Sequence, residues 1–239
     1  MTDIQTRRRY YFSHHTVQVM GLLAIAGLAL AVRRGDAAAA GMFAVGWGVY
    51  VVEEYLVHRF IFHAPAPRQQ WLFDVLYRLH YGHHDQVANR YLLFTPLWFA
   101  LSLTIVNAAF VAVFVPLELV IIGAFGGGVT AYLLFEWLHL ASHFRYPDKG
   151  RLARHITRRH ARHHHVDYAY WYTVSPGGGL VDTALGSDPA NRAVVPHVNT
   201  CGIDPQDPRF VRSRARYGTD VSLANGAPVH TRTSAAQAS

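Results

Sequence analysis

The stretch "LVIIGAFGGGVTAYLLFEWLHLASH", residues 119–143, runs from an apolar segment directly into two histidines. Glu136 is the single charged residue in residues 119–138, and about 20 apolar residues suffice for a helix to cross a bilayer. His139 and His143 are spaced H-x-x-x-H, so on a helix they share one face. The stretch predicts a membrane-spanning helix that presents histidines just beyond the bilayer.

Three further stretches have the same apolar character. Residues 16–32 and 37–52 are uncharged and separated by "RRGD", which predicts a helical hairpin, and residues 91–117 precede the quoted stretch. One such stretch alone fits a buried helix of a soluble protein, and the first also resembles a signal peptide, but four together favour the membrane. We therefore expect an all-α integral membrane protein with four transmembrane helices in two hairpins, near residues 12–32, 37–57, 94–115 and 118–138.

The overall composition supports a membrane location. Hydrophobic residues make up 51% of the 239 and charged residues only 15%, which is low for a water-soluble domain. The formal net charge of +7 lies beside apolar runs and not in a nucleic-acid-binding motif, so anionic lipid head groups fit better as a partner than nucleic acid. Cys201 is the single cysteine, which excludes an intrachain disulfide and a Cys-x-x-Cys metal site, and we assign it no role.

The arginines predict the orientation in the membrane. With four spans, Arg33 and Arg34 fall on one side, and the opposite side holds Arg7, Arg8, Arg9, Arg59, Arg68, Arg78, Arg90 and the set from Arg145 to Arg162. Because arginine-rich loops stay in the cytoplasm, we expect residues 58–90 and 139–186 to form a cytosolic cap. The membrane domain would then cover residues 1–186, with a partly disordered extension over 187–239. The composition resembles that of a GC-rich bacterial genome, so we expect a bacterial inner membrane.

Ten of the sixteen histidines fall into four short motifs. The motifs are H-x-x-x-x-H (His58, His63), H-x-x-H-H (His80, His83, His84), H-x-x-x-H (His139, His143) and H-x-x-H-H again (His160, His163, His164). Residues three and four apart share a helix face, whereas five steps turn about 140° away, so we expect the chain to bend back near His63. One motif alone is typical of a solvated surface. Four on one side of a membrane predict a metal site, and ten imidazoles exceed the four ligands of a usual zinc site, which favours two metals.

Other side chains are candidates to orient these rings. Glu54 and Glu136 precede a motif histidine by four and three residues, and Asp85 and Asp167 follow the two H-x-x-H-H motifs. The simpler interpretation of the two glutamates is as charges at the membrane surface. The remaining histidines are divided into possible orienting groups (His155, His165, His197), of which His165 is also an alternative ligand to His164, and interfacial or solvated residues (His14, His15, His230). Imidazole suits iron, zinc and copper alike.

These motifs resemble the fatty acid hydroxylase superfamily, which also contains sterol desaturases and carotenoid hydroxylases. The resemblance runs from about Glu54 to Gly186 and rests on "HRFIFH", "LHYGHHD", "YLLFTP", "EWLHLASH", "RRHARHH" and "VSPGGGLVDTALGS". It implies a four-helix membrane anchor under a cytosolic helical cap, and two iron ions held by the ten motif histidines. It further implies hydroxylation of a lipid C–H bond with O₂ as co-substrate, and zinc as a substitute metal in purified protein.

The resemblance leaves partners and reaction type open. No stretch of the 239 residues matches the H-P-G-G of the cytochrome b5 domain fused to several eukaryotic members, so the implied electron donor is a separate ferredoxin, cytochrome or reductase. A desaturase or a carotenoid or sterol hydroxylase would use the same centre. A non-catalytic metal-binding or transport protein is disfavoured, because its histidines would line a path across the bilayer. Candidates to line an acyl slot, or to belong to the interface belt, are Trp71, Tyr81, Trp137, Tyr170 and Trp171.

Overall fold

The computed structural model describes residues 4–87, 89–143, 150–189 and 200–218, and over these residues the chain is helical without a β-strand. The all-α prediction is thereby confirmed. The α-helices are α1 (Ile4–Phe12), α2 (His15–Arg34), α3 (Ala37–Val57), α4 (Gln70–Leu76), α5 (Gly82–Asp85), α6 (Arg90–Leu93), α7 (Leu97–Val111), α8 (Leu117–Ile121), α9 (Val129–His143), α10 (Arg151–His165), α11 (Gly178–Ala184) and α12 (Pro208–Tyr217). Three π-helical segments are η1 (His58–Phe62), η2 (Tyr77–Tyr81) and η3 (Ile122–Gly128).

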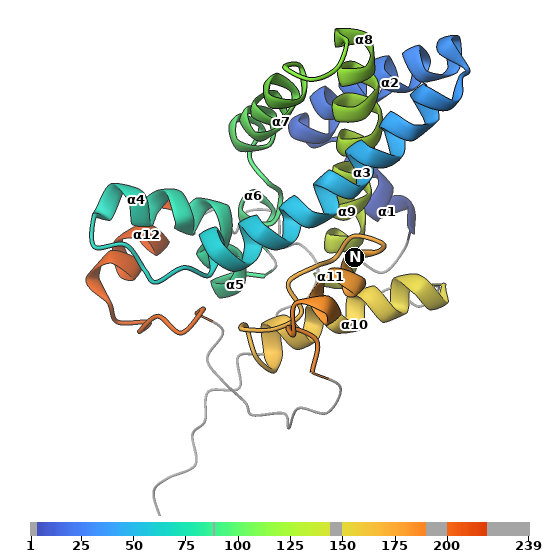
Figure 1. Cartoon of the computed structure of the whole chain (residues 1–239). Coiled ribbons are helices and arrows are strands. Elements are labelled where there is room, and N and C mark those ends of the chain that lie inside the picture. The colour runs from blue at the N-terminus through green and yellow to red at the C-terminus, as the bar shows by residue number, and fades with distance from the viewer. Residues whose placement is uncertain (1–3, 88, 144–149, 190–199, 219–239) are drawn as a thin grey trace, which may run out of the picture.

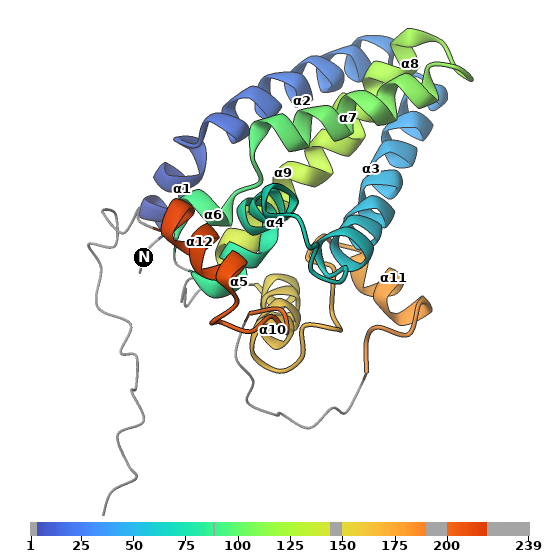
Figure 2. The same cartoon turned by 90° about the vertical axis from the view of Figure 1, so that its left-hand side faces the viewer.

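The long helices gather at one end of the molecule and the short ones at the other. Figures 1 and 2 show α2, α3, α7 and α8 reaching a common tip, while α4, α5, α10, α11 and α12 form the opposite end, called the cap below. At the tip, Gly35 ends α2 with a φ of 63°, and Asp36 caps α3 by accepting a hydrogen bond from the backbone N–H of Ala39 at 2.8 Å. The "RRGD" hairpin is therefore built by helix-capping chemistry.

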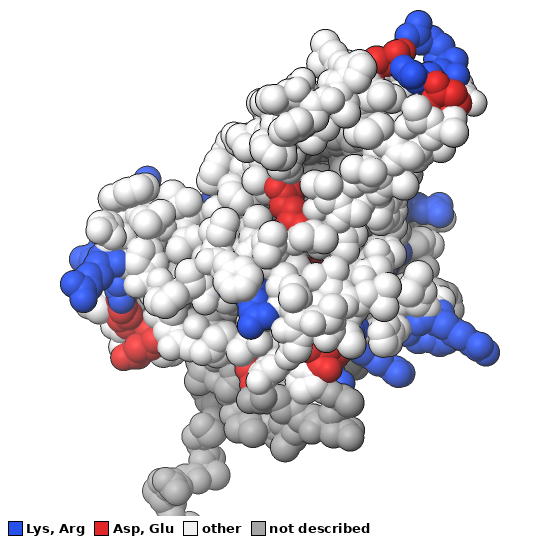
Figure 3. Space-filling view, in the orientation of Figure 1, with Lys and Arg blue, Asp and Glu red and all other residues white. Residues whose placement is uncertain are grey.

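The two arginines of the tip form ion pairs with Glu118 from another hairpin, and Arg34 also pairs with Asp36 of its own hairpin. Arg33 and Arg34 each lie within 2.9 Å of a Glu118 carboxylate oxygen, at the start of α8. Figure 3 shows this charged tip, and below it a face on which most of the surface is uncharged until the cap begins. The arrangement suits a protein whose middle section lies in lipid.

Three helical segments, and not four, are long and apolar enough to cross a membrane within the described part of the chain. They are His15–Arg34, Tyr91–Val111 and Leu117–His143. The last is the continuous run of α8, η3 and α9 that corresponds to the quoted stretch. The expected span over residues 37–57 is present as the 21-residue helix α3, which carries Glu53 and Glu54 in its last two turns and is not among the three.

Glycines allow the membrane helices to approach backbone to backbone. A Cβ on Gly46 of α3 would overlap the carbonyl of Gly123 in η3, and a Cβ on Gly27 of α2 would overlap the backbone of Gly126. In lipid the hydrophobic effect does not drive helices together, so their association depends on close packing, which small residues at the crossing points allow. The run "GGG" at 126–128 therefore serves helix packing.

Leucine at Gly46 should destabilise the protein, because the side chain forces α3 away from η3. Overpacking of this kind costs about 1–3 kcal/mol, which lowers Tm by roughly 2–12 °C in a protein of this size. The measurement is thermal unfolding in detergent. Gly48→Leu is the matched control, since a Cβ at that position would meet no other atom within 4 Å, and an equal loss in both variants would contradict the packing role.

The cap has its own aromatic core, to which the C-terminal extension contributes. Phe73, Tyr77 and Tyr81 of α4 and η2 pack against Phe210 of α12, which is fully buried. Asp74 accepts hydrogen bonds from Ser213 and Arg216 of the same helix at 2.6 and 2.9 Å. Part of the region after residue 187 is therefore an ordered element of the cap. Residues 219–239, the last part of the expected disordered extension, lie outside the described residues.

Candidate metal centre

The ten motif histidines lie in two groups of five. The first cluster contains His58, His63, His80, His84 and His163, and the second cluster contains His83, His139, His143, His160 and His164. In each cluster one nitrogen per ring lies within 4.8 Å of all the others. The first cluster joins η1, η2, α5 and α10, and the second joins α5, α9 and α10. The structure thus contains two separate histidine clusters, as expected for two metal sites.

A π-helix solves the spacing problem of His58 and His63. The backbone N–H of His63 donates to the carbonyl of His58 at 3.1 Å, which is the i to i+5 bond of a π-turn. This wider turn brings residues five apart back to one side, whereas an α-helix would separate them. The helix ends at Phe62 with His63 as its C-cap, as expected near His63, and the π-turn is what brings that residue back toward His58. The spacing of five was itself the signal for this local structure.

Each H-x-x-H-H motif supplies both clusters. His80 and His84 enter the first cluster while His83 enters the second, and His160 and His164 enter the second while His163 enters the first. Successive helix residues point about 100° apart, so neighbours in the chain cannot face the same centre. The rings of His84 and His164 stack with centroids 4.0 Å apart, which places the two clusters side by side.

The converging nitrogens fit metal ions. In the first cluster the Nε2 atom of His63 lies 2.8 Å from that of His80 and 3.2 Å from that of His163. In the second cluster, the Nε2 atom of His160 lies 2.9 Å from that of His143 and 3.0 Å from that of His164. Nitrogen ligands that lie about 2.1 Å from one metal ion are separated from one another by comparable distances. A hydrogen bond does not explain the convergence of several rings, because one proton is shared by only two nitrogens.

Burial keeps these rings neutral and therefore able to bind metal. The pKa of His58 is lowered to about 3 by loss of hydration, and burial also lowers the pKa of His80, His83 and His160. The Nε2 atom of His58 is buried without a hydrogen-bond partner. A cation at each cluster would satisfy such atoms, so the donor set fits two metal ions.

The protein without metal should lose stability as the pH falls. A lowered pKa in the folded state means that the unfolded chain binds more protons below pH 6.5, so stability falls with pH. When the pH falls from 7.5 to 5.5, each such imidazole lowers the free energy of unfolding by about 1.4 kcal/mol. Thermal unfolding of chelator-treated protein at the two pH values tests this. His155→Ala, at an exposed position, should show the same difference, and an unchanged Tm in the parent protein would contradict the neutral cluster.

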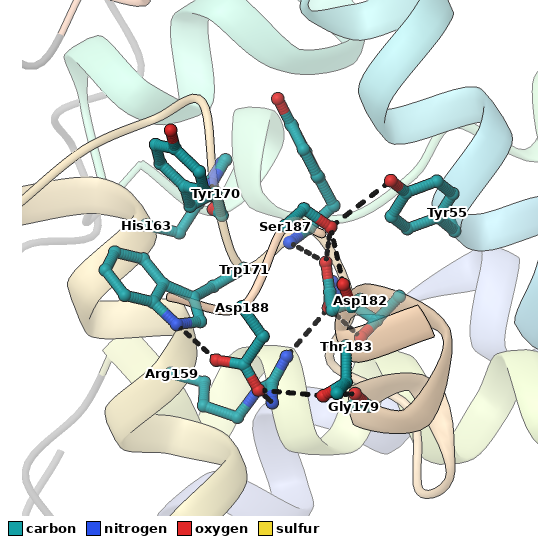
Figure 4. Close-up of polar contacts among 12 residues, drawn as sticks. Tyr55, Arg159, His163, Tyr170, Trp171, Gly179, Asp182, Thr183, Ser187 and Asp188 are labelled. Carbon is teal, nitrogen blue, oxygen red and sulfur yellow. Dashed lines mark hydrogen bonds and ion pairs between the residues drawn. The ribbon is translucent and has the colours of Figure 1, made fainter. Parts of the chain in front are cut away.

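Backbone carbonyls of residues 170–172 orient two histidines of the first cluster. The Nδ1 atom of His163 lies 2.7 Å from the carbonyl oxygen of Tyr170, and that of His58 is hydrogen-bonded to the carbonyl of Tyr172. The other ring nitrogen is thereby directed into the cluster. Figure 4 shows Tyr170 beside His163.

The four predicted orienting carboxylates have other hydrogen-bond partners in the structure. Glu54 accepts from the backbone N–H groups of residues 174 and 175, and Glu136 accepts from Tyr132 and from the backbone of Thr95. Asp85 pairs with Arg214 of α12, and Asp167 accepts from the backbone N–H of Ala169. Glu54 thus holds the segment whose carbonyls orient the histidine rings. Sequence spacing alone had predicted that the carboxylates bind the histidines nearest to them in the chain.

Asp182 holds this segment in place and was not singled out from the sequence. Its fully buried carboxylate accepts from the backbone N–H groups of Tyr172 and Thr173 and forms an ion pair with Arg159 at 2.8 Å. Trp171 has a φ of 56°, an unfavourable conformation for a bulky residue, and its backbone N–H donates to Ser187. Figure 4 shows Asp182 beside Arg159 and Ser187. The available signal was the segment "VSPGGGLVDTALGS", which contains it.

The histidines outside the four motifs lie away from the clusters. His155 and His165 are exposed on α10, so the alternative of His165 as a ligand in place of His164 does not match the geometry. His15 is exposed, and half-buried His14 stacks on Phe94 with centroids 4.3 Å apart. His197 and His230 lie outside the described residues.

An apolar cavity leads from the membrane helices to both clusters. Its walls come from α3, α7 and the α8–α9 run, with Val45, Leu103 and Ala124 among them. Near the cap it is lined by His58 and His80 of the first cluster and by His83, His139 and His160 of the second. Asn107 donates to Glu53 at 2.7 Å and joins α7 to α3 within this wall.

The aromatic residues predicted to line an acyl slot do not line this cavity. Trp71 is 66% exposed, Trp137 packs under Arg7, and Trp171 is fully buried beside Tyr170. Tyr81 lines a separate pocket beside His63. The aromatic side chains in the wall are Tyr50, Phe62, Phe99, Tyr132 and Phe135. They come from α3, η1, α7 and α9, and which of their residues face the cavity is not revealed by residue type or nearness in sequence.

Fold and site together define a helical membrane protein with a histidine-rich dimetal centre at the end of an apolar cavity. Residues 43–187 match the profile of the fatty acid hydroxylase family, so the chain belongs to that family. The resemblance expected from the motifs is confirmed. The chain is an integral membrane protein with three candidate spans.

Several family members are similar over about half of this chain. A fatty acid 2-hydroxylase of Rattus norvegicus is 31% identical over 129 residues, which are 52% of this chain and 33% of the relative. The fatty acid 2-hydroxylase of Homo sapiens is 28% identical over 138 residues, covering 56% and 36%. A ceramide very long chain fatty acid hydroxylase of Saccharomyces cerevisiae, SCS7, is 28% identical over 136 residues, covering 56% and 35%. The matched part spans about a third of the length of these curated relatives.

A solved structure has the same fold. The full-length scs7p structure, in which only the hydroxylase domain is visible, superposes with a TM-score of 0.61 at 23% identity and covers 74% of this chain and 69% of that one. At this identity the likeness establishes the architecture alone.

Proposed function

We propose that this chain is a membrane-bound, O₂-dependent hydroxylase of a lipid acyl chain that uses two iron ions. The observation that carries the proposal is the apolar cavity, which begins among the membrane helices and ends on histidines of both clusters. A lipid chain lying there would present a methylene group to the dimetal centre while its remainder stays among apolar side chains. The family membership supports a lipid as substrate.

The ten motif histidines would hold the metals, five to each cluster. Two iron ions would supply the activation of O₂ and the oxidation of the C–H bond. The protein positions the acyl chain against them and excludes water through Phe62, Phe99 and Phe135. Zinc has the same preference for imidazole and would replace iron in purified protein without this chemistry.

The membrane arrangement that we propose has four spans, with α3 as the fourth. Its 21 residues reach across a bilayer, and its glycine contact with η3 keeps it among the other spans. The arginines of the cap support a cytoplasmic location for the metal centre, in a bacterial inner membrane. Electrons would come from a separate ferredoxin, cytochrome or reductase.

Lipid mass spectrometry with ¹⁸O₂ tests the proposed function. Cells that express the chain should contain a lipid heavier by one labelled oxygen, and cells that express His83→Ala should not, since this variant lacks a histidine of the second cluster. Loss of two hydrogens without label would instead identify a desaturase. An unchanged lipid profile, with a reductant known to be present, would refute oxidation of lipid in that host.

Phenylalanine at Ala124 should shift the chain-length preference toward shorter lipids. Ala124 lines the cavity in η3, in the membrane part of the wall, and the larger side chain fills space that a long acyl chain needs. A single methylene group in a hydrophobic pocket changes relative rates by about 10- to 200-fold. Product chain lengths from a mixed lipid pool are the measurement. Ala109→Phe, which is exposed and outside the wall, should leave them unchanged, and identical profiles for all three proteins would count against the cavity as the acyl site.

A further inference from the structure

One face of α10 carries a stripe of arginines. Arg151, Arg154, Arg158 and Arg162 follow one another at spacings of three and four residues and are all exposed. The helix contains no acidic residue, and within the described part of the chain none of the four forms an ion pair. Like charges at this spacing repel one another and disfavour the helix. An external anionic partner would relieve that repulsion.

The opposite face of the same helix carries ligands of both clusters. His160 and His164 belong to the second cluster and His163 to the first, and all three are buried. Arg159, also on the buried side, is paired with Asp182 and Asp188, which sets it apart from the four exposed arginines. A helix with its side chains is about 10–12 Å across. A partner on the stripe would therefore lie about one helix thickness from both clusters.

The position of α10 favours a protein partner over lipid. Figures 1 and 2 place α10 in the cap, at the end away from the tip, and Figure 3 shows basic side chains projecting from this end. Helices that lie on a membrane surface insert a large apolar face, whereas Leu152 is the one large apolar side chain exposed on α10.

We propose that the arginine stripe of α10 is the docking surface for a small acidic electron-transfer protein. The inference rests on the proposed function, because hydroxylation places one oxygen atom of O₂ in the lipid and reduces the other to water. That balance consumes two electrons and two protons. A one-electron carrier would supply the electrons in two encounters and leave oxidised each time, and the ligand histidines of α10 provide the short route to the metals. Complementary charge would speed each encounter.

The test compares charge reversal on α10 with an equal change elsewhere. The variant Arg151→Glu/Arg154→Glu/Arg158→Glu leaves Arg162, which lies over Trp171, in place. Arg8→Glu/Arg9→Glu/Arg212→Glu changes the net charge equally at exposed positions on α1 and α12. Metal-loaded full chain in nanodiscs is titrated with a small acidic [2Fe–2S] ferredoxin. The Kd of ferredoxin for each protein is measured in this titration. Turnover is measured separately, with either reduced ferredoxin or dithionite as the electron source.

We expect the α10 variant to bind ferredoxin at least 10-fold more weakly and to show a correspondingly raised KM for it, with dithionite-driven turnover unchanged. The control variant should match the parent protein, and 0.5 M salt should remove the difference between them. Ferredoxin affinity that is equal in all three proteins overturns the proposal. Weaker binding of the α10 variant to vesicles with 30% phosphatidylglycerol, at unchanged ferredoxin affinity, assigns the stripe to lipid. Absent turnover of the parent protein with dithionite refutes the hydroxylase function but leaves the binding result intact.

Discussion

Alanine at His163 should remove the metal of the first cluster, and alanine at His164 should remove that of the second, whereas alanine at His165 should leave both in place. The three residues are consecutive on α10, yet their side chains point to the first cluster, the second cluster and solvent. Metal content should fall from two ions per chain to one in each of the first two variants. Because groups that merely orient ligands are worth about 10- to 100-fold in activity, loss of a ligand should lower lipid hydroxylation at least about 100-fold.

The measurement is elemental analysis of protein purified with iron, together with hydroxylation of a lipid pool. His165→Ala is the matched control, since it removes an imidazole from the same helix turn without touching either cluster. We expect His163→Ala and His164→Ala each to lose one metal. If His84→Ala then behaves like His163→Ala, and His83→Ala like His164→Ala, each H-x-x-H-H motif supplies histidines to both clusters. Loss of metal by His165→Ala, with full retention by His164→Ala, would instead support an over-wound α10.

Alanine at Asp182 should give the largest loss of stability among substitutions outside the histidines. Removal of the carboxylate leaves Arg159 buried without this partner and deprives Tyr172 and Thr173 of their backbone acceptor. Breaking one side of a buried ion pair costs about 3–5 kcal/mol. Residues 170–172 would lose the conformation that aims their carbonyls at His58 and His163, so the first cluster should also bind metal more weakly.

Chemical unfolding in detergent and metal titration together test this role. Asp188→Asn is the matched control, because Asp188 also pairs with Arg159 but is only partly buried and keeps an acceptor for the indole N–H of Trp171. It should cost much less stability and leave metal affinity unchanged. A weakened second cluster with an intact first one in Asp182→Ala would contradict the proposed path through residues 170–172.

The sequence by itself determined the class of the molecule and the ten histidines that lie in its two clusters. Apolar runs of bilayer length predict membrane helices because lipid offers no partners for an open backbone, and only a helix satisfies its own. The four histidine motifs marked the ten residues that lie in two clusters, since repetition on one side of the spans has no simpler explanation. The family resemblance followed from the same motifs and is confirmed over residues 43–187.

Only the tertiary structure decided how those histidines divide, what orients them and where a substrate would lie. Adjacent residues such as His83 and His84 enter different clusters because a helix turns about 100° per residue, and which centre each meets depends on α9 and α10, distant in the chain. Asp182 orients the first cluster through backbone carbonyls, which carry no sequence signature. The cavity wall is likewise formed where α3, α7 and η3 meet, so nearness in sequence pointed to the wrong aromatic residues.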